Sequence, residues 1–64
     1  MSYKLILEEL IDINECAALL KLSISKLRKM CMKKEIPHLK LGQRVLFYKP
    51  DLSKWIMSNN INNP

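Results

Sequence analysis

The sequence predicts a small α+β domain made of two short helices, a β-hairpin and a third helix. Three observations predict it. Apolar residues recur at helical spacing twice between residues 12 and 34, strand-like alternation replaces that spacing after Pro37, and helical spacing returns after Pro50. The chain has 64 residues, of which 48% are hydrophobic, so it suffices for one small core.

The first helix is expected to begin after Asp12. Asp12 and Glu15 have the spacing of a capping box, in which each side chain accepts a hydrogen bond from the other residue's backbone N–H. Ile11 is placed to pack on Cys16 across this cap. The apolar stripe of the helix is Ile13, Cys16, Ala17 and Leu20. We expect the helix to end near Lys21.

The second helix is expected to follow within a few residues, with Ser23 as its N-cap. Leu22 and Leu27 occupy the positions of a hydrophobic staple. The side predicted to face inward holds Ile24, Leu27, Met30 and Cys31. The opposite side holds Ser25, Lys26, Arg28, Lys29, Met32 and Lys33. The helix should stop before Glu35, because Pro37 disfavours helical backbone at the residue before it.

A hairpin is predicted after Pro37. Residues 39–41 alternate between apolar and polar, residues 42–44 form the turn with Gly42, and residues 45–48 are β-branched, apolar and aromatic. Arg44 lies at or near the tip. Pro50 then suits the first turn of a third helix. The inward face of that helix is Leu52, Trp55 and Ile56.

The two ends of the chain are predicted less specifically. Residues 1–9 form an N-terminal segment that is a short helix, a strand or an oligomer contact, and the pattern does not choose between them. Residues 10–57 form the domain. Residues 58–64 are polar and of low complexity, so we expect a disordered tail.

Positive charge is concentrated in the middle of the chain. Residues 21–40 hold seven Lys or Arg and one acid, a local net charge of +6, whereas residues 1–20 have a net charge of −3 and the whole chain has +5. Such a concentration of cations suits a polyanion, because each neutralised phosphate releases condensed counterions.

Several classes of function are disfavoured. The two cysteines, Cys16 and Cys31, form no disulfide framework and with a lone His38 make no metal site, so we expect buried thiols, no cofactor and a reducing, cytoplasmic environment. No apolar run reaches the length of about 18 residues that a membrane span needs, and a signal peptide is not expected. The sequence offers no nucleophile with a base and no phosphate loop, so we do not expect an enzyme.

Two helices joined by a tight turn, with a basic outer face on the second, are typical of a helix-turn-helix, and the hairpin adds a wing. The predicted fold is therefore a winged helix-turn-helix: helix-turn-helix, β-hairpin wing and C-terminal helix. In such a fold the second helix reads base edges in the major groove of double-stranded DNA, while flanking cations hold phosphates.

The sequence also resembles the excisionase-type winged helix-turn-helix family of the MerR superfamily. The resemblance covers Leu10 to Ile56 without gaps. The matched pieces are DINECAALL at 12–20, LSISKL at 22–27, EIP at 35–37, KLGQRV at 40–45 and DLSKWI at 51–56. No single piece is specific, but their order and spacing are.

The resemblance implies a DNA-binding protein of a phage or integrative element. Some members are excisionases (recombination directionality factors), which bind beside an attachment site, bend the DNA and help a recombinase excise the element. Others are short transcriptional regulators. Core positions implied by the resemblance are Leu19, Leu27, Leu52 and Trp55. The residues expected to contact DNA are Ser23, Ser25, Lys26, Arg28, Lys29 and Lys33 on the second helix, and Gln43 and Arg44 on the wing.

The chain departs from the family pattern at three positions. Many relatives have glycine between the helices and after the second helix, where this chain has Lys21 and Lys34. Lysine carries strain there if the backbone needs a positive φ, and two more cations near phosphate would be the compensation. Position 24 is often basic in relatives and here is Ile.

Three functions remain open at this point: an excisionase, a small transcriptional regulator of a mobile element, and, from another class, a protein-interaction module that docks an acidic partner. The partners expected for the first are double-stranded DNA, an integrase or other recombinase, and further copies of the chain on adjacent sites, because one short domain makes few base contacts.

Overall fold

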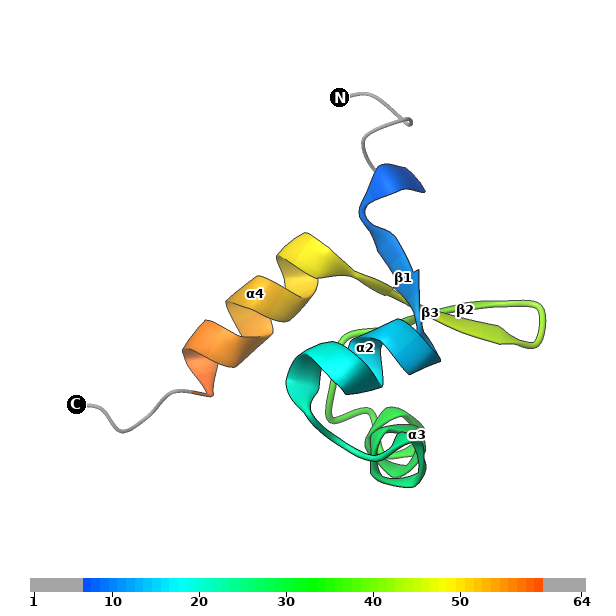
Figure 1. The fold of residues 1–64 in the computed structure, drawn as a ribbon, viewed down its shortest axis with the longest axis horizontal. Helices are drawn as coiled ribbons and strands as arrows, with labels where there is room; N and C mark the ends of the chain where they lie inside the picture. Colours follow the sequence, from blue (N-terminus) through cyan, green and yellow to red (C-terminus); the bar gives the residue numbers. More distant parts are fainter. Residues whose placement is uncertain (1–6, 60–64) are drawn as a thin grey trace.

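The computed structural model describes residues 7–59 of the chain. Leu7 and Glu8 are helical, and Glu9 turns into the first strand. The elements that follow are β1 (Leu10–Asp12), α2 (Ile13–Leu20), α3 (Ile24–Met32), β2 (Leu39–Leu41), β3 (Arg44–Tyr48) and α4 (Lys49–Ser58). Two helices joined by a tight turn, a β-hairpin wing and a closing helix make this a winged helix-turn-helix, as predicted (Figure 1).

Local capping sets where α2 and α3 begin. The backbone N–H of Glu15 donates to Oδ1 of Asp12 over 2.8 Å, and the N–H of Asp12 donates to Oε1 of Glu15 over 3.2 Å. The Ser23 hydroxyl accepts from the N–H of Lys26 over 3.1 Å. Both predicted caps are confirmed, because these side chains satisfy N–H groups that the first turn of a helix leaves free.

The sheet has three antiparallel strands in the order β1-β3-β2. Residues 42 and 43 form the tip between β2 and β3, and Arg44, which the sequence analysis placed in the turn, instead begins β3 and pairs with Leu41. Gly42 has a φ of +63° at the first position of this two-residue turn, where glycine fits without steric cost.

Strand β1 was not predicted. It pairs with the half of β3 nearer α4, in the register Leu10 with Tyr48 and Ile11 with Phe47. Three residues are too few to show an alternating pattern, and the pairing joins segments more than thirty residues apart. It fastens the residues that precede α2 to the base of the wing.

The core lies between the helices and the sheet. Its buried members are Ile11, Cys16, Ala17, Leu27, Cys31, Ile36, Phe47 and Leu52. Three residues expected to point inward do not: Leu19 is 59% exposed, Ile24 39% and Ile56 46%. Each lies at the edge of its helix stripe, where a core of this size leaves part of the stripe uncovered. Trp55 is half-buried and packs against the core.

Helix α4 begins as expected and ends later than expected. Pro50 and Asp51 lie in its first turn. Ser58 and Asn59 were assigned to the tail, but Ser58 belongs to the helix, and the Ser58 hydroxyl and the Asn59 side-chain amide both donate to the carbonyl oxygen of Trp55. The expectations for residues 1–6 and 60–64 fall outside the described residues. Within residues 7–59, no helix has the length and apolarity to cross a membrane.

Candidate nucleic-acid interface

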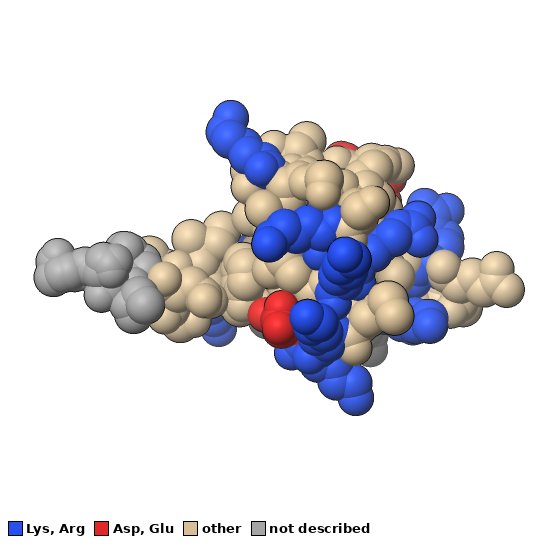
Figure 2. All heavy atoms as spheres, turned by 90° about the horizontal axis from the view of Figure 1, so that it is seen from below, with Lys and Arg blue, Asp and Glu red and all other residues tan. Residues whose placement is uncertain are grey.

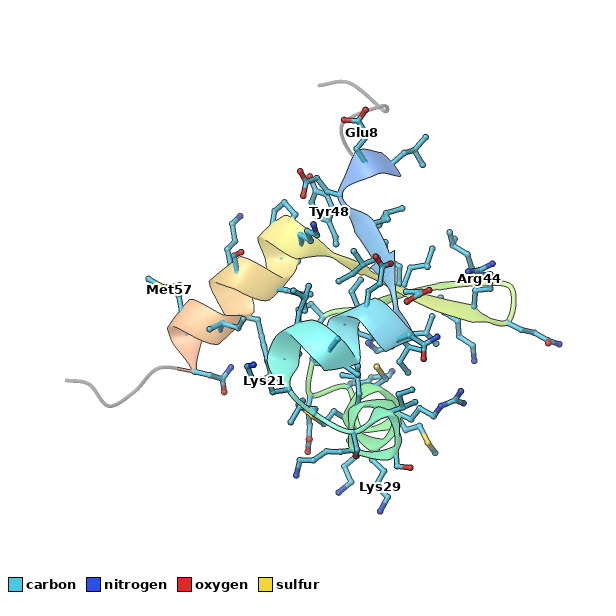
Figure 3. All side chains as sticks on the ribbon, in the orientation of Figure 1. Glu8, Lys21, Lys29, Arg44, Tyr48 and Met57 are labelled. Carbon is cyan, nitrogen blue, oxygen red and sulfur yellow. The ribbon has the colours of Figure 1, made fainter. Side chains whose placement is uncertain are left out.

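Helix α3 separates its side chains into two faces. Leu27 and Cys31 are buried, and Met30 packs against the core. The polar residues of the other side are exposed, as predicted: Ser25, Lys26, Arg28, Lys29 and Lys33. Figure 3 shows Lys29 pointing away from the rest of the protein, below α3. The helix therefore presents a row of cations and a hydroxyl to a ligand.

No residue in the first turn of α3 offsets the partial positive charge at the N-terminus of the helix. The turn holds no acidic residue, and Lys26 lies within it. The N-terminus of a helix carries a partial positive charge, which an anion or acidic side chain normally offsets. Ser23 at the N-cap is exposed. This end of the helix is thus strongly positive and open to an anion.

The wing extends away from the helices on the side opposite α4 (Figure 1). Gln43 at the tip and Arg44 at the start of β3 are both exposed, and Figure 3 shows Arg44 on the outer part of the wing. Both residues therefore lie on the wing, Gln43 in the turn and Arg44 in the strand that follows it. A short two-residue turn keeps these side chains close to rigid, paired backbone.

A hollow of about 210 Å³ joins α3, the wing and the start of α2. Arg28 of α3 and Gln43 and Arg44 of the wing all line it. Its remaining walls are Asp12, Ile13, Asn14 and Val45. The structure therefore brings one predicted helix residue, Arg28, to the same concave site as the two predicted wing residues, Gln43 and Arg44. The other predicted residues of the helix do not line this hollow: Ser23, Ser25, Lys26, Lys29 and Lys33.

A second hollow of about 210 Å³ lies beside the first, between α3 and the inner part of the wing. Arg28 lines this one too, together with Met32, His38 and Lys40. Met32 is 81% exposed. Ile13, Arg28 and Val45 line both hollows. Arg28 is the charged residue of these three, and it lies at the junction of helix and wing.

Basic side chains dominate the face that carries α3. Figure 2 shows this face from below, with Lys and Arg gathered across its centre and toward the wing, a small acidic patch beside them, and further acidic atoms only at the upper edge of the view. The concentration of charge seen in residues 21–40 of the sequence is therefore a concentration in space. A surface of this kind attracts a polyanion and raises its association rate.

The two cysteines have the role predicted for them. Both are free thiols in the core. Burial, with the neighbouring Cys31 thiol as a smaller cause, raises the pKa of Cys16 to about 11, and burial also raises the pKa of Cys31. Thiols with raised pKa values are poor nucleophiles and poor metal ligands at neutral pH. Among residues 7–59, no group of three His, Cys, Asp or Glu side chains is placed to hold a metal ion.

His38 contributes to the loop before the wing. Its Nδ1 lies 2.8 Å from the carbonyl oxygen of Ile36, and its ring tilts against Phe47 at a centroid distance of 6.5 Å. The imidazole supports the segment that leads from α3 into β2.

Sequence reasoning missed three contributors to this surface. Asp12 and Asn14 line the hollow with Arg28, and Lys40 lines the second hollow. Asp12 was recognised as a cap, but its distance from the wing depends on β1, which was not predicted. Lys40 pairs with Val45 in the hairpin. The alternation of residues 39–41 could have indicated which side of the hairpin Lys40 faces.

In a comparison with known protein families, residues 10–60 match the family described as helix-turn-helix domain. No curated protein and no solved structure matches the chain. The match covers most of the chain, and both helices and the wing described above lie within it. Domains of this kind bind double-stranded DNA, with the second helix in the major groove. The chain belongs to the helix-turn-helix domain family and is a DNA-binding protein.

Proposed function

We propose that this protein is an excisionase, or recombination directionality factor, of a phage or integrative element, and that it binds and bends DNA beside an attachment site to assist a recombinase. The observation that supports DNA binding by helix and wing together is the shared hollow, because Arg28, Gln43 and Arg44 line one concave site. The recombination role rests on the resemblance of residues 10–56 to excisionase-type domains. A helix and a wing that act on the same side of the protein engage neighbouring parts of one duplex.

In this proposal α3 enters the major groove. Arg28 contacts a base edge, because it lies where helix and wing meet and its guanidinium can form two hydrogen bonds to guanine. Ser23, Ser25 and Lys26 act at the N-terminal half of the helix, the part that reads bases in helix-turn-helix proteins. Lys29 and Lys33 hold phosphates.

The wing contacts the minor groove or the adjacent backbone through Gln43 and Arg44. Contacts to two neighbouring grooves favour a bent duplex, since the bend brings more phosphate to the protein. Bending is the property that an excisionase contributes to the recombination complex. Several copies on adjacent sites, or the recombinase itself, would supply the specificity that one small domain lacks.

Binding is tested by fluorescence anisotropy of a labelled duplex that carries the ends of the element, measured from 50 to 300 mM salt. We expect about five phosphate contacts and a log–log slope of about −4 to −5. Energy transfer between dyes on the two duplex ends should rise on binding if the DNA bends. A slope near zero contradicts DNA binding by this surface.

The recombination role needs an excision assay with a candidate recombinase of the same phage or integrative element. We expect excision to require this protein and to be lost in Arg28→Ala. Binding at a promoter without any effect on excision would instead identify a transcriptional regulator. Binding to an acidic protein, with no preference among duplex sequences at physiological salt, would identify an interaction module.

A further inference from the structure

Two lysines have a backbone conformation that lysine rarely adopts. Among residues 7–59, the non-glycine residues with positive φ are Lys21, at 58°, and Lys34, at 59°. This left-handed region suits glycine, which has no Cβ to collide with the backbone. Both side chains are exposed, so neither lysine is held there by packing in the core.

Lys21 ends α2. Its N–H donates to the carbonyl oxygen of Ala18 over 3.3 Å, and the N–H of Leu22 donates to Ala17 over 3.0 Å. These two bonds form a Schellman motif, in which a left-handed residue reverses the chain and satisfies the last carbonyl groups of the helix. The motif requires the positive φ of Lys21 and makes the turn into α3 short.

Lys34 ends α3 in the same way. Its N–H donates to the carbonyl oxygen of Cys31 over 3.0 Å, and the N–H of Glu35 donates to Met30 over 2.8 Å. The turn geometry is satisfied by backbone atoms alone, so glycine would serve it with less strain. Lysine at both positions therefore calls for a function of the side chain.

The two lysines bracket α3. The helix has nine residues and is about 14 Å long at 1.5 Å per residue, close to the width of about 12 Å of the major groove. Lys21 precedes the first residue of α3 by three positions, and Lys34 follows its last residue by two. A helix that lies in the groove therefore carries one lysine at each end, toward the sugar–phosphate backbones that border the groove. Figure 3 shows Lys21 beside the turn between α2 and α3, away from the wing.

We propose that Lys21 and Lys34 bind phosphates on the two sides of the groove that α3 occupies, and that they fix the position of the helix there without reading sequence. The inference rests on the proposed DNA binding and adds a pair of phosphate contacts at the strained helix ends. The competing explanation is electrostatic: a cation near the C-terminus of a helix is favourable to the helix dipole. The two explanations differ in what happens to DNA binding.

The test compares three double variants with the wild-type chain. Lys21→Gly/Lys34→Gly removes both charges and relieves the backbone. Lys21→Arg/Lys34→Arg keeps charge and strain. Lys49→Gln/Lys54→Gln removes two exposed cations from α4, outside both hollows beside α3, and controls for net charge. Asparagine, which also adopts the left-handed region, replaces glycine if the glycine variant does not fold.

We expect the glycine variant to melt about 5 °C higher than the wild type, because strain is relieved. Its affinity for duplex DNA at 0.15 M salt should fall about 30-fold, and its log–log salt slope should become less negative by about 1.8, which corresponds to two lost phosphates. All duplex sequences should weaken alike. The arginine variant should retain the wild-type slope, and the control should change it little.

Two results overturn the inference. One is a glycine variant with the wild-type salt slope and affinity. The other is a loss of binding no greater than that of the α4 control, which would make net charge the whole cause. Wild-type protein that fails to bind duplex DNA in a salt-dependent way refutes the proposed function itself, so the two failures are distinguishable.

Discussion

The indole Nε1 of Trp55 donates a hydrogen bond to the carbonyl oxygen of Glu35 over 2.9 Å. The bond ties α4 to the loop between α3 and β2. Ile36, the next residue in that loop, is buried in the core. The C-terminal helix thus holds the segment that sets the spacing between α3 and the wing, although α4 lies on the other side of the molecule (Figure 1).

Trp55→Ala should destabilise the domain by about 3 kcal/mol, the low end of the range for a tryptophan truncation, because the side chain is half-buried. Thermal unfolding followed by circular dichroism would show a midpoint lower by about 15 °C. Trp55→Phe is the matched control: it keeps most of the packing and loses the hydrogen bond, at about 1 kcal/mol. Equal midpoints for Trp55→Ala and the wild type would contradict the packing role.

Arg28→Ala and Lys33→Ala should weaken DNA binding in different ways. Arg28 lines both hollows, so its loss should reduce discrimination between related duplexes by about 1–3 kcal/mol. Lys33→Ala should weaken all duplexes equally and make the salt slope less negative by about 0.9. Anisotropy titrations with a cognate and a mutated duplex separate the two effects. The division of roles is wrong if both variants behave alike.

Asp12→Asn should bind DNA more tightly than the wild type. Asp12 lines the hollow with Arg28 and Arg44, so its carboxylate repels an incoming phosphate. Asparagine is an equally good N-cap, and only the interaction of the charge with the helix dipole is lost, at about 0.3–1 kcal/mol. Asp51→Asn, in the first turn of α4, controls for net charge. A similar gain in affinity from both variants would show that the position of Asp12 is unimportant.

Stability should fall at alkaline pH partly because of Cys16. Burial raises the pKa of this thiol to about 11 from a value of 9.0, so the folded state holds the proton more tightly than the unfolded state does. The contribution is fully present below pH 9 and is lost as the pH rises through about 11. Urea unfolding at pH 8, 9, 10 and 11 would show a decline that is smaller in Cys16→Ala, which has no thiol at this position. Identical declines would remove Cys16 as a cause.

Local signals in the sequence predicted the elements well. The capping box of Asp12, the N-cap at Ser23 and the turn at Gly42 each act within a few residues, and the structure confirms all three. The same is true of the charged face of α3, because helical spacing alone decides which residues share a side.

Features that depend on distant contacts were not predictable in this way. Strand β1 exists because Leu10–Asp12 meets β3. The family resemblance placed Leu19 in the core, and helical spacing placed Ile56 on an inward face. The area of the opposing surface decides burial, and both side chains are exposed. The shared hollow of Arg28 and Arg44 likewise depends on how the wing is held, which helical and strand periods do not specify.

Strand β3 is paired on both sides at Leu46, with Leu39 in β2 and with Asp12 in β1, and it continues directly into α4. A strand so anchored resists pivoting at its root. The hairpin is therefore rigid, and its angle to α3 is fixed in the folded protein. When the protein docks, we expect the double helix to supply the necessary deformation, so that flexible base steps beneath Gln43 become part of the recognised sequence.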